Sequence, residues 1–193
     1  MKQLWSEFEQ WLELNYLKSG DIFNTAATKM EIAQSENIMG LEFPESFKEL
    51  LLMHNGQKSE CIGIIGNYDL LSLDEIVHGW QVMKELFDGG EFEDFEEVEP
   101  VGPVKGEFWW NPLWIPIVTN TTGDYICIDL DPAEGGKRGQ IITFWHDWEE
   151  RQVVSDSLEK WFHQIVTHLK NGTYKLVKED GELMFNNYGF IEE

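Results

Sequence analysis

The segment TTGDYICIDLDPAEGGKRGQIITFWHDW, residues 121–148, places two apolar runs on either side of a glycine-rich turn. In the first run, one set of alternate residues is Ile126, Ile128 and Leu130, and the other set is Tyr125, Cys127 and Asp129. This period of two predicts a β-strand. One apolar face and one partly polar face are typical of an antiparallel sheet. The second run, QIITFW, predicts the partner strand, so the segment indicates a β-hairpin.

Helical patterns lie on both sides of this hairpin. They occupy residues 4–12, 28–40, 44–54, 72–88 and 155–171. The first and last have apolar residues three and four apart, which predicts amphipathic helices. Two of the others begin with capping-box sequences, in which Thr28 precedes Glu31 and Ser72 precedes Glu75. Helices therefore surround the predicted strands.

The remaining segments complete the expected fold. WIPIV (114–118) predicts a strand before the hairpin, and residues 173–185 predict a terminal strand pair that turns at Asp180–Gly181. We expect Ser155 or Asp156 to cap the last helix. No linker divides residues 1–193, so we expect a single α+β domain, an antiparallel β-sheet flanked by helices.

The composition narrows the possible partners. The chain has 14 basic and 36 acidic residues, a formal net charge of −22. Nucleic-acid binding depends on cationic neutralisation, and anionic membranes also repel such a chain, so neither is an expected partner. A basic protein is the natural complement of this charge. Neither a signal-peptide pattern nor a disulfide spacing is present, and we expect a cytoplasmic protein.

An acidic segment, residues 85–99, contains eight acids and no base, interleaved with phenylalanines. A charge run of this kind is usually a solvated face. The phenylalanines nevertheless leave a docking role open. The candidate partner-binding acids of this segment are Glu91, Glu93, Asp94, Glu96 and Glu97.

Tryptophans supply the second group of candidates. Adjacent residues of a strand point to opposite sides, so Trp109 and Trp110 are not both expected to face inward. Trp145 and Trp148 lie beside Asp147 at the end of the hairpin. An exposed tryptophan with acidic neighbours is typical of a binding hot spot. We therefore expect these five residues to contribute to a partner-binding surface, with core packing as the alternative for most of the tryptophans.

The carboxylates of the hairpin raise the alternative of a catalytic or metal site. Its spacing fits neither a calcium loop nor a phosphate loop. Asp129 and Asp131 lie on one face of a strand, about 7 Å apart, which suits an inverting glycosidase. Asp131 precedes Pro132, however, and this favours a turn in which the aspartate bonds its own backbone. We expect no catalytic residues, no cofactor and no metal.

The ordered motifs resemble the SUKH superfamily, which joins fungal cell-wall and glucan-synthesis regulators of the Smi/Knr type to bacterial toxin-immunity proteins. The resemblance rests on LEFPESFKELLLMHNG, LLSLDEI, GPVKGEFWWNPLWIPI, TGDYICIDLDPAEGGKRGQIITFW and VVSDSLEKWFHQIVTHL. It covers residues 28–170. The acid-rich stretch near 91–99 and the extension at 172–193 depart from a minimal member.

This resemblance implies a single α+β domain without catalytic residues that acts by binding a protein. The leading hypothesis is an immunity protein that masks a cognate toxin, such as a basic nuclease. The alternatives are a regulatory scaffold in cell-wall or glucan synthesis and, least favoured, a hydrolase that uses Asp129 and Asp131. The sequence leaves the oligomeric state open.

Overall fold

The computed structural model describes residues 1–15, 17–93, 95, 98–120, 122–179 and 182–191. Its helices are α1 (Lys2–Leu14), α2 (Ser19–Ile22), α3 (Lys29–Met39), α4 (Glu45–Leu51), α5 (Leu73–Asp88) and α6 (Leu158–Asn171). Its strands are β1 (Asp69–Leu70), β2 (Glu99–Val101), β3 (Trp114–Thr119), β4 (Tyr125–Asp129), β5 (Gln140–Phe144), β6 (Glu150–Ser155), β7 (Leu176–Glu179) and β8 (Glu182–Phe185). These elements confirm the α+β class.

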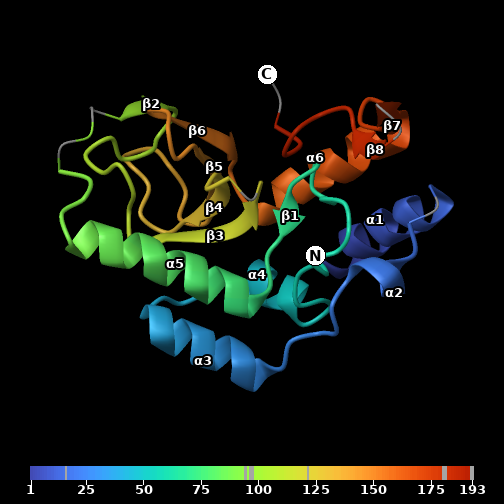
Figure 1. Cartoon of the computed structure of the whole chain (residues 1–193), viewed down its shortest axis with the longest axis horizontal. Coiled ribbons are helices and arrows are strands. Elements are labelled where there is room, and N and C mark those ends of the chain that lie inside the picture. Colours follow the sequence, from blue (N-terminus) through green and yellow to red (C-terminus); the bar gives the residue numbers. More distant parts are fainter. Residues whose placement is uncertain (16, 94, 96–97, 121, 180–181, 192–193) are drawn as a thin grey trace.

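Six strands form one sheet in the order β1-β3-β4-β5-β6-β2. Every neighbouring pair is antiparallel except β2 and β6, which are parallel. The predicted hairpin is β4 and β5, with Ile128 opposite Ile141. Figure 1 shows β2 and β6 together at one end of the sheet, while β7 and β8 form a separate antiparallel pair beside α6. The predicted turn at 180–181 lies outside the described residues.

Both faces of the central strands are covered, so the partly polar face expected on β4 is present but lies in the interior. Helix α5 packs along β3 and approaches β4 so closely that a β-carbon on Gly79 would lie 3.1 Å from the Tyr125 hydroxyl. On the opposite face, the C-terminal segment at Gly189 approaches the Ile126 side chain. Cys127 and Asp129 are consequently fully buried. The polar residues of this strand serve the core rather than a solvent-facing surface.

The helix ends follow local signals. Both predicted capping boxes are present, at the starts of α3 and α5. The cap of α6 is Ser157, whose hydroxyl accepts from the Lys160 N–H, and not Ser155 or Asp156 as the pattern had suggested. Ser155 instead ends β6, a strand that the sequence pattern did not predict. None of the helices among the described residues combines the length and apolarity needed to span a bilayer.

Candidate protein-binding surface

Asp129 and Asp131 lie where β4 leaves the sheet, and all four of their carboxylate oxygens accept hydrogen bonds from the protein. Asp129 is fully buried and accepts from the Asp131 N–H and the Gln140 amide, each at 2.8 Å. Asp131 accepts from Lys105 at 2.7 Å and Asn111 at 3.1 Å. These bonds hold the corner before the glycine-rich turn. The two carboxylates thus have separate structural partners.

The pKa values of Asp129 and Asp131 move in opposite directions, because burial dominates at Asp129 and polar partners dominate at Asp131. Burial raises the pKa of Asp129, and its hydrogen bonds only partly oppose this. Burial also acts to raise the pKa of Asp131, but the hydrogen bonds from Lys105 and Asn111 outweigh it and lower that pKa. A split of this kind can indicate an acid–base pair. Here all four carboxylate oxygens accept structural hydrogen bonds, so the opposite pKa shifts reflect the packing of the corner at the end of β4.

Trp109 and Trp110 are both buried, 8% and 1% exposed, and the expectation that one of them faces solvent is wrong. They lie in a bend ahead of β3, which begins only at Trp114, so the alternation of a strand does not apply to them. Trp110 packs edge-on against Trp80 and Phe87. An irregular backbone can direct neighbouring side chains to the same side, and here both enter the core.

Arg151 explains how Trp109 is held, and sequence reasoning did not identify it. The side chain is fully buried, with its guanidinium 4.8 Å from the centre of the Trp109 ring and 4.6 Å from that of Phe144. The guanidinium donates to the backbone carbonyls of Trp109, Trp148 and Glu150. Burial lowers the pKa of Arg151 to about 10, so it is still charged at neutral pH. One interior cation therefore joins the Trp109 bend to the loop that carries Trp148.

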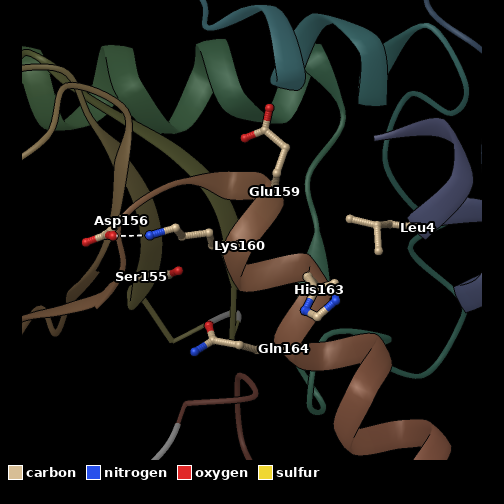
Figure 2. Close-up of a pocket in the computed structure, with 7 residues that line it drawn as sticks. All are labelled: Leu4, Ser155, Asp156, Glu159, Lys160, His163 and Gln164. Atoms are coloured by element: carbon tan, nitrogen blue, oxygen red, sulfur yellow. Dashed lines mark hydrogen bonds and ion pairs between the residues drawn. The ribbon is translucent and has the colours of Figure 1, made fainter.

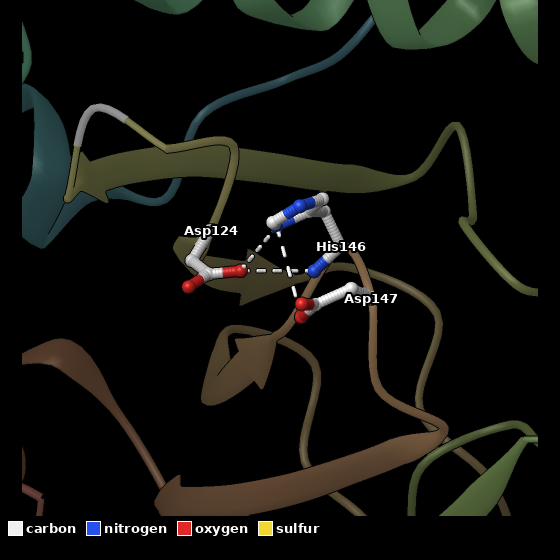
Figure 3. A group of neighbouring side chains, drawn as sticks. All are labelled: Asp124, His146 and Asp147. Atoms are coloured by element: carbon white, nitrogen blue, oxygen red, sulfur yellow. Dashed lines mark hydrogen bonds and ion pairs between the residues drawn. The ribbon is translucent and has the colours of Figure 1, made fainter.

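The loop between β5 and β6 presents the exposed tryptophan that the sequence predicted. Trp148 is 60% exposed, Trp145 is half-buried, and Asp147 is exposed. Figure 3 shows Asp124 reaching from the preceding turn, where its Oδ1 accepts from the backbone N–H and the ring Nδ1 of His146, both at 2.9 Å. This contact anchors the base of the loop. Trp148 is held at the tip of a fixed turn.

Asp124, His146 and Asp147 are also the group of potential metal ligands among the described residues. Their ligand atoms lie within 4.8 Å of one another. However, Asp124 Oδ1 already accepts both hydrogen bonds from His146, and its Oδ2 accepts from Asn120 at 2.7 Å. Asp124 and His146 therefore have a structural role in joining two turns.

The acidic segment reaches the same end of the sheet through β2. The Glu99 N–H donates to the Glu149 carbonyl at 2.9 Å, and Glu99 pairs with Glu150 in the parallel register. Acidic residues therefore lie directly beside the loop that carries Trp148. Glu91 and Glu93 are exposed, as expected, whereas the candidates Asp94, Glu96 and Glu97 lie outside the described residues. We call Glu99, Asp147, Trp148, Glu149 and Glu150 the acidic edge.

Next to the acidic edge lie two adjoining cavities of about 430 and 380 Å³. They share four lining residues, Phe92, Glu93, Glu107 and Trp109. We call the two together the aromatic groove. The Trp109 carbonyl and the Trp148 carbonyl bind the same guanidinium, so the groove and the acidic edge are neighbours.

A larger cavity, about 660 Å³, lies between the start of α6 and Leu4 of α1. Figure 2 shows one ion pair among the side chains that line it, between Lys160 and Asp156. Hydrogen bonds from Lys137 and Lys160 lower the pKa of Asp156 to about 2. Because its lining contains a lysine as well as acids, this cavity offers less selectivity for a charged partner than the groove does.

Comparison with known proteins adds to this geometry. Residues 26–164, more than half of the chain, match the model of the SMI1 / KNR4 family (SUKH-1). The chain belongs to the SMI1/KNR4 family. The resemblance drawn from the sequence motifs is thereby confirmed.

Individual relatives within the SMI1/KNR4 family are distant. The chain is 24% identical to the cell wall assembly regulator SMI1 of Saccharomyces cerevisiae, over 95% of the chain and 44% of that protein. It is 23% identical to the glucan synthesis regulatory protein of Neurospora crassa, over 95% of the chain and 41% of that protein. The chain is 24% identical to the cell wall biosynthesis/cell cycle regulator smi1 of Schizosaccharomyces pombe, over 95% of the chain and 39% of that protein. The chain thus spans less than half the length of these relatives. Their names describe regulators, and they favour the regulatory alternative over the immunity hypothesis.

Proposed function

We propose that this chain is a non-enzymatic protein-binding domain that acts in the regulation of cell-wall or glucan synthesis. The observation that supports binding is Trp148, a large aromatic side chain that is 60% exposed on a loop held in place by Asp124 and Arg151. The regulatory process is inferred from the names of the distant relatives. The separate structural roles of Asp129 and Asp131 support a function without hydrolysis.

The acidic edge gives this proposal a physical mechanism. Tryptophan is enriched at interface hot spots, because its ring buries a large apolar area when a partner covers it. The carboxylates around Trp148 contribute less to affinity than to attraction and orientation, since exposed charges are screened by water and salt. A net charge of −22 extends the attraction to the whole molecule. The partner we expect is therefore a protein with a basic surface and an apolar recess for Trp148.

The charge also supports a second candidate, an immunity protein that masks a basic toxin domain such as a nuclease. The two candidates share a binding surface and differ in the partner. They are separated by genetics in the organism that carries the gene. Deleting the gene should lower wall glucan content and increase sensitivity to a glucan-digesting enzyme if the regulatory proposal is correct.

The same deletion strain also shows which result would contradict the regulatory proposal. If wall glucan and lysis sensitivity are unchanged, while the strain is killed by a toxin encoded beside the gene, the regulatory proposal is wrong and the immunity candidate replaces it. A strain that carries the Trp148→Ala variant is the control for a binding mechanism. It should reproduce the deletion phenotype even though the variant protein is folded and present at normal amounts.

A further inference from the structure

The aromatic groove has a composition that points to one chemical class of ligand. It is lined by five aromatic rings, those of Phe87, Phe92, Phe95, Phe108 and Trp109. Phe95 is 47% exposed and packs on Trp109 with ring centres 4.5 Å apart. The groove is therefore an open surface feature whose floor is fixed by buried Trp109.

Charge in the groove has a single sign. Its two charged lining residues are Glu93 and Glu107, both exposed, and among the described residues neither forms an ion pair within 4.0 Å. Lysine, arginine and histidine are absent from its described lining. Aromatic rings have electron-rich faces, so they attract cations in the same way that the carboxylates do. The rings and the carboxylates thus favour the same kind of guest.

The interior of the protein contains an example of this recognition. The Arg151 guanidinium lies 4.8 Å from the centre of the Trp109 ring and donates to the Trp109 carbonyl at 3.1 Å. A guanidinium is planar and weakly hydrated, so it stacks on rings and bonds carboxylates with less desolvation cost than an ammonium group. Cavities of about 380 and 430 Å³ are within the roughly 300–1,000 Å³ range of ordinary ligand pockets.

We propose that the aromatic groove binds an arginine side chain of the partner protein, next to the contact made by Trp148. This inference rests on the proposed protein-binding function and names the chemistry of the partner at that surface. In this proposal the guanidinium lies against the rings of Phe92 and Phe95, and the carboxylates of Glu93 and Glu107 accept its hydrogen bonds. A basic partner is thereby recognised by shape and stacking as well as by net charge.

The test uses the whole chain, labelled with ¹⁵N, and three capped peptides, Gly-Gly-Arg-Gly-Gly and its citrulline and lysine equivalents. The arginine peptide should shift the Trp109 indole and the Gly90 and Gly106 amide signals. Citrulline has the same shape without charge, and lysine has the charge without the planar group. Both should bind more weakly, because each lacks one of the two features that the groove accommodates. Equal shifts with citrulline or with lysine would overturn the proposal.

Variants distinguish binding in the groove from general electrostatic attraction to the negatively charged protein. The double variant Glu93→Gln/Glu107→Gln should weaken binding of the arginine peptide about fivefold, since exposed ion pairs each contribute up to about 1 kcal/mol. The control is Glu13→Gln/Glu60→Gln, which removes the same charge from exposed residues outside the groove. Phe95→Ala tests the stacking contribution at a side chain exposed enough to leave the fold intact. An equal loss in the control, or no loss in either groove variant, would refute the proposal.

The outcome is distinguishable from failure of the proposed function. If deletion of the gene alters wall glucan but the groove variants complement it fully, the regulatory function stands and the groove proposal is wrong. If the arginine peptide binds as expected but the deletion has no wall phenotype, the groove stands and the assigned process is wrong.

Discussion

Replacing Arg151 with methionine should destabilise the protein by about 3 kcal/mol, and it is the change that most directly tests how the surface is held. Three carbonyls, those of Trp109, Trp148 and Glu150, lose their donor. The buried Trp109 carbonyl costs about 2 kcal/mol unpaired, and the two partly buried carbonyls, which water can reach, cost about 1 kcal/mol each. Loss of two desolvated cation–π contacts adds about 2 kcal/mol.

A gain offsets part of this loss. Burial lowers the pKa of Arg151 from its ordinary 12.5 to about 10, which means that the charged form is disfavoured in the fold by about 3 kcal/mol. Methionine fills similar space and has no such penalty. The losses total about 6 kcal/mol, so the net destabilisation is about 3 kcal/mol. The assay is urea unfolding followed by tryptophan fluorescence, at constant slope.

The chain provides a matched control, because its other arginine, Arg138, is exposed and donates to the Leu130 carbonyl. Arg138→Met should cost less than about 1 kcal/mol. If Arg151→Met is as mild as this control, the interior guanidinium does not hold the Trp109 bend and the loop together. Wild-type stability combined with a changed tryptophan emission spectrum of the folded protein would refute the energetic reasoning while retaining the positional role.

Three further outcomes follow from the site. Trp148→Ala should leave the free energy of unfolding within about 0.5 kcal/mol of wild type. It should weaken partner binding, measured by calorimetry, by about 2 kcal/mol, and an unchanged affinity would exclude Trp148 from the interface. Asp129→Asn should lower the free energy of unfolding in urea by about 2 kcal/mol, because the new amide N–H group would face the N–H donor of Gln140. An unchanged free energy of unfolding would mean that the corner rearranges freely. Asp156→Asn should lower the melting temperature slightly at pH 7 but not near pH 2. The depressed pKa of the Asp156 carboxylate stabilises the fold above about pH 3.8, and this stabilisation is lost as the pH falls through about 2. A difference in melting temperature that does not depend on pH would contradict the ion-pair explanation.

Much of the fold could be read from local patterns. The apolar spacing of α6 predicted all six of its buried residues, namely Leu158, Trp161, Phe162, Ile165, Val166 and Leu169. Capping boxes located two helix starts, because the side chain that satisfies the first backbone N–H groups is only three residues away. Gly172 ended α6 in the left-handed conformation that glycine adopts easily. The candidate surface was partly predictable for the same reason, since an aromatic residue between acids, Trp148, is poorly suited to a core.

Errors arose where distant segments meet. Trp109 and Trp110 were expected to diverge, but they lie in a bend whose direction is determined by contacts with α5 and Arg151. At Tyr125 the polar face of β4 is covered by α5, which lies more than thirty residues earlier in the chain. Nothing adjacent to Arg151 in the sequence distinguishes it from a surface cation.

The sequence by itself determined the class of the fold, the family and the excess of negative charge, because hydrophobic periodicity, caps and composition are local or additive properties. Only the tertiary structure decided which acids and aromatic rings share a surface. The parallel pairing of β2 with β6 brings Glu99 beside Glu150, and a single guanidinium joins Trp109 to Trp148. These contacts link residues that are about 40 to 50 positions apart. Their geometry depends on how the sheet closes and which helices cover it, and a local pattern carries no information about either.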